Sequence, residues 1–165
     1  MPLLLLAALL VLAAAAPAAM AVGAGVVLNT DTQPAEVDLP IYPGATIRRD
    51  KGDDGNGLSF SLWGGSVGFK LALLKYRSTA SVDEVAAFYR KALARHGEVL
   101  DCSNPPPAAR AASADDKKAL SCGDGKVDAG GRVYKAGTGE HQRVVSIKPA
   151  GPQVEFDLVR LDTAP

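Results

Sequence analysis

The side chains best suited to chemistry in this sequence are its two histidines, His96 and His141. His141 follows Glu140 in the glycine-containing segment 137–142, and a loop that presents a carboxylate beside an imidazole could bind a ligand or a metal ion. A solvated turn is the simpler interpretation of such a segment. His96 directly precedes Gly97, which favours a role as a cation at the C-terminus of a helix. We therefore retain Glu140 and His141 as candidate ligand contacts and assign no catalytic residue.

The motifs that would indicate a cofactor or a metal are missing from the sequence. Residues 65–68 are typical of a hairpin turn and do not form the Gly-x-Ser-x-Gly elbow of a serine hydrolase. The acidic clusters 53–57 and 124–128 resemble calcium loops only superficially, because Lys126 or Leu58 stands where an oxygen ligand is needed. There is no Gly-Lys-Thr/Ser ending of a phosphate-binding loop. The sequence thus predicts no cofactor and no metal site.

The two cysteines, Cys102 and Cys122, are predicted to form a structural disulfide. The bridge would close a loop of about 20 residues and stabilise the fold by about 3 kcal/mol in the chain-entropy model. Two buried free thiols are the alternative. A redox role is disfavoured, since the two cysteines of a catalytic dithiol are usually separated by only two residues.

Trp63 is the third candidate for a ligand or partner contact. It ends the alternating segment 58–63 and precedes two glycines, so its side chain is predicted to point away from the apolar face of that strand. An exposed Trp beside a turn suits contact with a partner. The alternative is that Trp63 covers a second layer of the fold.

Charge and composition narrow the function classes. The chain has 165 residues, with 18 Lys and Arg balanced by 18 Asp and Glu. Cations and anions are intermixed, and no basic stripe is present, which argues against nucleic-acid binding. Apolar residues make up 47% of the chain, but they are concentrated in residues 1–28, which contain no charged side chain.

This apolar N-terminus is typical of a signal peptide. An uninterrupted apolar run covers residues 3–16, and Ala19-Met20-Ala21 offers a small-x-small cleavage pattern, which predicts a signal peptide over residues 1–21. No Lys or Arg precedes the run. An uncleaved membrane anchor that extends to Leu28 is the alternative. Both interpretations place the rest of the chain outside the cytoplasm.

The remaining chain is predicted to be a linker over residues 22–38 and a single domain over residues 39–162. The linker is inferred from the polar stretch that begins at Asn29. The segment Tyr42-Pro43-Gly44-Ala45 meets the requirements of a type II turn. A short strand is expected over residues 45–49.

Two hairpins are predicted in this domain. The first joins the alternating segment 58–63 to the apolar segment 67–77 through a glycine pair, and the second strand is expected to be covered on both faces. The second hairpin pairs residues 143–148 with residues 154–161 around a Pro-Ala-Gly-Pro turn. There Lys148 and Glu155 should be neighbours across the strands on the solvent side.

One main helix is predicted from Val82 to about His96. Ser81 and Glu84 form a capping box at its start, and Gly97 provides its stop. A further short strand is expected over residues 99–102. The fold class is therefore α+β, with an antiparallel sheet of about five or six strands and one main helix across one face.

The turn at residues 42–45, the Tyr76-Arg77-Ser78 segment and the helix containing Phe88-Tyr89 resemble those of small exported bacterial proteins. The C-terminal segments 135–138, 144–148 and 156–159 are also similar to such proteins. The resemblance implies a bacterial envelope location and this fold. Its motifs are structural, so no functional residue follows from it.

The function predicted from the sequence is that of a non-catalytic exported module of the periplasm or cell surface. It would bind an envelope protein, a peptide or a small envelope ligand, with no nucleic-acid partner. Membrane contact is expected only through an uncleaved N-terminal anchor. One alternative is a small secreted hydrolase that uses His141 with a nearby acidic or hydroxyl residue. Another is an inhibitor of envelope proteases that presents a rigid loop over residues 104–109.

Overall fold

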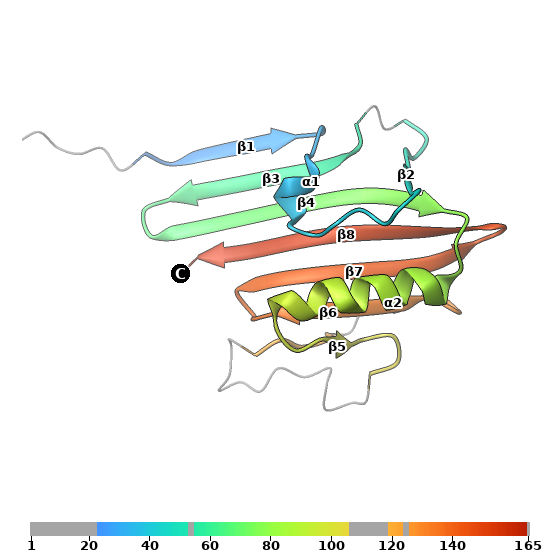
Figure 1. Ribbon diagram of the computed structural model, residues 1–165. Coiled ribbons are helices and arrows are strands. Elements are labelled where there is room, and N and C mark those ends of the chain that lie inside the picture. Colours follow the sequence, from blue (N-terminus) through green and yellow to red (C-terminus); the bar gives the residue numbers. More distant parts are fainter. Residues whose placement is uncertain (1–22, 53–54, 106–118, 124–125, 165) are drawn as a thin grey trace, which may run out of the picture.

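The computed structural model describes residues 23–52, 55–105, 119–123 and 126–164. Eight strands form one antiparallel sheet with a helix across one of its faces (Figure 1). The strands are β1 (Gly25–Asn29), β2 (Thr46–Ile47), β3 (Gly57–Gly64), β4 (Val67–Ser78), β5 (Leu100–Asp101), β6 (Arg132–Gly137), β7 (His141–Ala150) and β8 (Gln153–Ala164). The helical segments are α1 (Pro34–Val37), α2 (Val82–Leu93) and the 3-10 turn η1 (Ala94–His96).

The strands lie in the order β1-β3-β4-β8-β7-β6-β5, and β2 pairs with β4 beyond the end of β3. The two 12-residue strands β4 and β8 pair at the centre. The predicted α+β domain with an antiparallel sheet and one main helix is confirmed. The sheet has eight strands and not five or six, because β1 and β6 add to the six predicted strands. In β1 the apolar residues continue the apolar composition of residues 1–24, and in β6 Arg132 and Lys135 break the apolar alternation.

The structure corrects the predicted linker over residues 22–38. β1 pairs with β3 along its whole length, and α1 fully buries Val37 in the core. Of the predicted anchor that extends to Leu28, residues 1–22 lie outside the described part of the chain, and residues 25–28 form part of β1.

The β3–β4 hairpin forms as predicted, with its turn one residue further along the chain. The turn residues are Gly65 and Ser66, and Gly65 has a φ of 59°, which glycine adopts without steric cost. The expected cover on both faces of β4 is found on one face only. Leu74 is buried on the side that faces the helices, whereas Leu71 and Leu73 on the opposite side are half-buried.

The helix begins and ends where the sequence predicts. The Ser81 hydroxyl accepts a hydrogen bond from the Glu84 backbone N–H at 3.2 Å, and the Glu84 carboxylate accepts one from the Ser81 backbone N–H at 2.8 Å. The helix continues through η1 to Gly97, whose φ is 130°. These contacts confirm the predicted capping box and helix stop.

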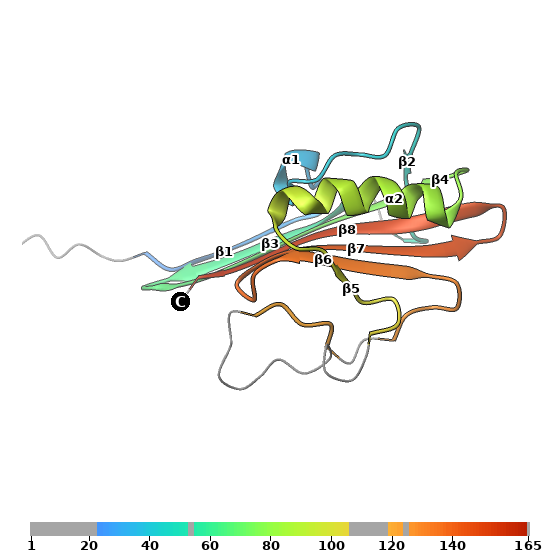
Figure 2. The same cartoon turned by 60° about the horizontal axis from the view of Figure 1, so that its bottom comes forward.

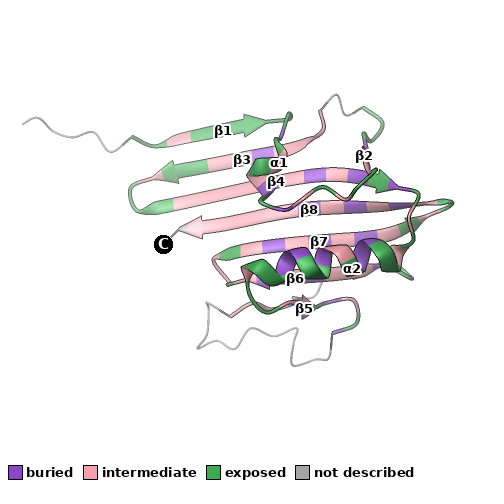
Figure 3. Cartoon of the chain, viewed as in Figure 1, coloured by how far each residue is buried: buried purple, intermediate pink, exposed green. Residues whose placement is uncertain are grey.

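The hydrophobic core lies between the helical segments α1 and α2 and the part of the sheet that they cover (Figure 3). Tyr89 of the helix is fully buried, and its ring centroid lies 5.4 Å from that of Phe156. Tyr76 stacks on Phe156 from β4 at 5.8 Å. The Tyr89 hydroxyl accepts a hydrogen bond from the backbone N–H of Tyr42 at 3.1 Å, which fixes the segment before the predicted turn. Burial raises the pKa of Tyr89, so this hydroxyl stays protonated.

The β7–β8 hairpin confirms the second predicted pairing. Val145 lies opposite Leu158, and Ile147 lies opposite Phe156, on the side that faces α2. Lys148 lies opposite Glu155, and the two form an ion pair at 3.4 Å, as expected for solvent-side neighbours. These strands carry the core positions of the C-terminal part of the chain.

Candidate functional site

The helix-facing side of the sheet changes from apolar to polar along the strands. Under the helical segments α1 and α2, Leu74 and Leu158 are buried core residues. Side chains on one face recur every second residue, so the same side of β4 carries Lys70 further out, and the same side of β8 carries Arg160. This outer end of the sheet, where β3 turns into β4 and β8 ends, extends beyond both helices (Figure 1). We call its helix-side surface the platform; it comprises Val27, Ser61, Trp63, Lys70, Arg160, Asp162 and His141.

The strand register brings two of the sequence-predicted contact residues onto the platform. Ser61, Lys70, Asp162 and His141 are successive cross-strand partners on neighbouring strands. Trp63 lies one row further out on the same face of β3. Since neighbouring strands are about 4.8 Å apart and rows about 7 Å apart, Trp63 and His141 flank the platform at a separation of three strands and one row, about 16 Å.

Trp63 lies flat against the edge strand. Its cross-strand partner is Gly25, and a Cβ atom at Gly25 would lie 2.4 Å from the Trp63 ring, so only glycine leaves room for the indole. The Trp63 side chain remains 46% exposed. The prediction that Trp63 points away from the apolar face of β3 is confirmed, since Leu58, Phe60 and Leu62 occupy the opposite face.

Both histidines belong to one polar network on the inner side of the platform. His141 Nδ1 lies 3.4 Å from Oδ1 of Asp162. Arg143 donates to Oδ1 of Asp162 at 3.1 Å and to Oδ2 of Asp38 at 3.2 Å. His96 Nε2 lies 3.1 Å from the backbone carbonyl oxygen of Asp38. Two carboxylates thus connect the end of α2 to the outer ends of β7 and β8.

Asp162 is the centre of this network. It accepts hydrogen bonds from Arg160 and Arg143. Partial burial raises its pKa, but the hydrogen bonds and positive charges of these two arginines outweigh that effect and hold the pKa below the usual range. A carboxylate engaged by two arginines is a poor proton acceptor. It also contacts the imidazole of His141, whose side chain is 63% exposed.

Glu140 lies in the tight turn between β6 and β7. The Thr138 hydroxyl accepts a hydrogen bond from the His141 backbone N–H at 3.1 Å, and the Glu140 carbonyl accepts one from the Thr163 backbone N–H at 2.8 Å. The turn is therefore fixed to the end of β8. The structure brings Glu140 beside His141 at one border of the platform, away from Trp63.

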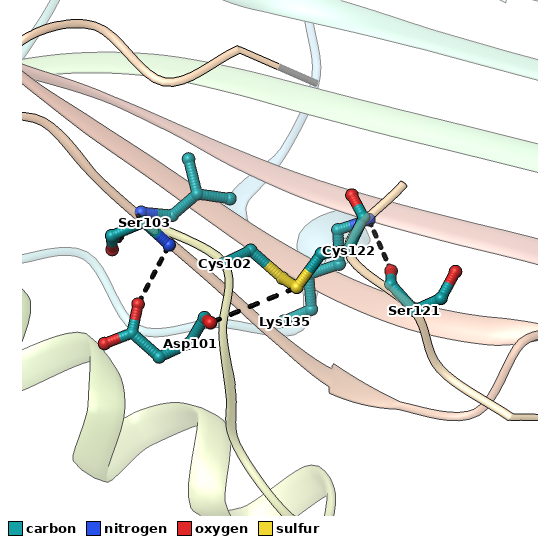
Figure 4. Close-up of a disulfide and its surroundings, with 7 residues drawn as sticks. Asp101, Cys102, Ser103, Ser121, Cys122 and Lys135 are labelled. Carbon is teal, nitrogen blue, oxygen red and sulfur yellow. Dashed lines mark hydrogen bonds between the residues drawn. A yellow bond between two sulfur atoms is a disulfide. The ribbon is translucent and has the colours of Figure 1, made fainter. Parts of the chain in front are cut away.

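The predicted disulfide between Cys102 and Cys122 is present (Figure 4). Lys135 Nζ donates to the carbonyl oxygens of Ser121 at 2.9 Å and Cys122 at 3.3 Å, which fixes the second cysteine to β6. Burial lowers the pKa of Lys135. The bridge is consistent with an oxidising, extracytoplasmic compartment.

Other features of the described residues add no second site. No group of three or more His, Cys, Asp and Glu side chains in this part of the chain could hold a metal ion. The acidic clusters 53–57 and 124–128, and the proposed inhibitory loop 104–109, lie partly outside the described residues. Among the described helices, none is long and apolar enough to cross a membrane.

Sequence reasoning missed five charged members of this site: Asp38, Lys70, Arg143, Arg160 and Asp162. A signal was present in β8, where the apolar alternation of residues 154, 156 and 158 continues as Arg160 and Asp162. A change from apolar to charged residues within one periodic strand indicates that the cover on that face ends.

Comparison of the chain with models of protein families, with curated proteins and with solved structures finds no match.

Proposed function

We propose that this protein is a non-catalytic exported module of the cell envelope that binds a peptide or small ligand on the platform. The observation that carries the proposal is the half-exposed Trp63, which lies flat beside a row of charged residues that neither of the described helices covers. A flat aromatic face next to fixed cations suits a ligand with one apolar or sugar face and one anionic group.

The charges of the platform favour an anionic group on the ligand. Lys70 lies between Ser61 and Asp162 in the row next to Trp63, and Arg160 lies one row further in on β8. The carboxylate of Asp162 is already engaged by two arginines. The ammonium of Lys70 is therefore the cation best placed to bind a ligand carboxylate while Trp63 contacts the rest of the molecule.

The envelope location rests on two features. The Cys102–Cys122 bridge supports an oxidising compartment, and the apolar residues 1–21 match a signal peptide. Small envelope molecules of the bacterial cell, such as wall glycopeptides, combine sugar rings with carboxylates and are the ligand class to test first.

Titration of the native protein with a soluble muramyl peptide tests this proposal. Trp63 is the only tryptophan, so its fluorescence reports directly on the platform. We expect saturable quenching of the Trp63 fluorescence. Calorimetry should show that Lys70→Gln weakens binding about tenfold, because one charged hydrogen bond is lost. An uncharged chitin oligosaccharide should bind more weakly.

The matched variants are Trp63→Ala and Leu62→Ala, adjacent residues on opposite faces of β3. Trp63→Ala should leave the fold intact and abolish binding, whereas Leu62→Ala should bind normally. Loss of folding in Trp63→Ala would place this residue in the core. Absence of saturable binding by carboxylated peptides and glycopeptides at millimolar concentration would contradict the platform as a ligand site.

A hydrolase that uses His141 is the second candidate function. The contact of His141 with Asp162 favours it, because a carboxylate that orients an imidazole is what a general base requires. Turnover of small ester or peptide substrates that is lost in His141→Ala would support it. Hydrolysis at the same background rate by the native protein and by His141→Ala would exclude this role.

A further inference from the structure

The side of the sheet opposite the helices carries a continuous apolar surface at its outer end. Cross-strand partners form three rows across neighbouring strands. We call this surface the apolar face; its members are Val26, Leu28, Leu58, Phe60, Leu62, Phe69, Leu71, Leu73, Val144, Val159 and Leu161. Phe60 and Phe69 pack against each other with ring centroids 5.8 Å apart.

Among the described residues, neither helix covers the apolar face. Both α1 and α2 lie on the other side of the sheet (Figure 2). The edge residue Leu28 is 65% exposed, and central residues such as Leu71 are only half-buried. The described part of the disulfide segment contacts this side at β6, through Lys135. A contiguous apolar surface of this extent marks a site of contact.

The apolar face ends at a sharp border of ion pairs. Arg48 contacts Glu155 and Asp157, each at 3.1 Å, and Asp50 at 3.2 Å. Lys75 pairs with Asp50 at 2.8 Å. The border therefore contains carboxylates as well as cations, and they already neutralise one another.

We propose that the apolar face packs against the same face of a second copy of the chain in a two-fold symmetric dimer. A uniformly apolar surface is self-complementary, as a two-fold interface requires. Eleven residues, on strands about 4.8 Å apart and in rows about 7 Å apart, give roughly 370 Å² per copy, so the dimer buries about 740 Å², the size of a weak, concentration-dependent interface. None of the eleven side chains is charged, so no charge is buried without a partner.

The border favours a second copy over a lipid surface. Anionic bilayers attract clusters of cations, whereas three carboxylates, Asp50, Glu155 and Asp157, line this border. A neutral border does not repel its own copy. The dimer leaves the platform free, since the platform lies on the opposite face of the sheet.

Two neighbouring residues of β1 provide a matched test. Leu28 belongs to the apolar face, whereas Val27, which is 51% exposed, points to the platform side. Analytical ultracentrifugation of the native protein should show a concentration-dependent dimer. Leu28→Lys should raise its dissociation constant at least about tenfold, because the symmetric interface would bury the ammonium twice. Val27→Lys should leave it unchanged. Thermal unfolding of both variants checks that the monomer fold is retained.

Three outcomes would overturn the proposal. A monomer at every concentration up to about 100 μM would show that the face does not self-associate at the affinity of a specific interface. Equal weakening by Val27→Lys and Leu28→Lys would indicate pairing of β1 edges. Binding to phosphatidylglycerol vesicles that is lost in Leu28→Lys, without self-association, would assign the face to the membrane. Leu62→Lys, on the neighbouring strand, should reproduce the Leu28→Lys result.

Discussion

The half of the sheet that the helices cover, the inner half, and the half that extends beyond them, the outer half, differ in which side of the sheet is apolar. In the inner half, the side that α1 and α2 cover carries Leu74, Phe156 and Leu158, and the opposite side carries the Arg48 ion pairs. In the outer half, the helix side carries the charged residues of the platform, and the opposite side is the apolar face. The same strands β4 and β8 pass through both halves.

This inversion shows that the apolar side of a single strand can change from one face of the sheet to the other along its length. A strand with a single cover repeats one pattern, apolar toward the cover and polar toward solvent. In β4, the residues from 68 to 72 on the helix side are Gly68, Lys70 and Ala72, whereas Phe69 and Leu71 on the other side are apolar. The pattern indicates two covers on opposite sides: the helical segments α1 and α2 for the inner half, and a second molecule for the outer half.

The largest expected effect comes from the core of the inner half. Phe156→Ala should lower the free energy of unfolding by about 3–5 kcal/mol, because Phe156 is fully buried among Tyr42, Tyr76 and Tyr89. Phe60→Ala, in the half-buried apolar face, should cost about half as much. Urea unfolding at low protein concentration, where the dimer dissociates, measures both. Equal losses would contradict the difference between the halves.

Removal of the disulfide should have the next largest effect. Replacing Cys102 and Cys122 together by serine should lower the stability by about 3 kcal/mol, since the bridge closes a loop with a sequence separation of 20. The bridge lies at the β5–β6 edge, so ligand binding at Trp63 and dimerisation should persist below the new melting temperature. Loss of either property in a folded double variant would show that the edge supports the outer half.

The smallest expected effect is an acid-dependent loss of stability in each half. The pKa of Asp162 on the platform and that of Glu84 in the helix cap are both depressed; for Glu84 the main cause is the hydrogen bond from the Ser81 backbone. A depressed carboxyl pKa stabilises the folded protein above the unfolded value of about 4, and this contribution is lost as the pH falls through the folded pKa. Urea titrations between pH 6 and pH 2 should therefore show a shallower acid loss in Asp162→Asn and in Glu84→Gln. An unchanged slope in Asp162→Asn would contradict the role of Asp162 in the network.

The predictable features of the fold are those that depend on neighbouring residues. The capping box at Ser81, the stop at Gly97 and the β7–β8 hairpin follow from local spacing, and the bridge follows from two cysteines and the predicted export. The network of Asp162 with Arg143 and the histidines depends on the register of distant strands, which spacing does not reveal. The alternation of Leu58, Phe60 and Leu62 predicts an apolar face but not the side of the sheet on which it lies.

Carbene footprinting of the native protein across a range of concentrations tests the central claim most directly. Leu62 and Trp63 are adjacent and similarly exposed, at 42% and 46%, but lie on opposite sides of the sheet. If the apolar face is covered by a second copy and the platform stays free, labelling of Leu62 falls as the dimer forms, while labelling of Trp63 stays constant. Parallel behaviour of the two residues, whether both stay constant or both fall, would contradict it.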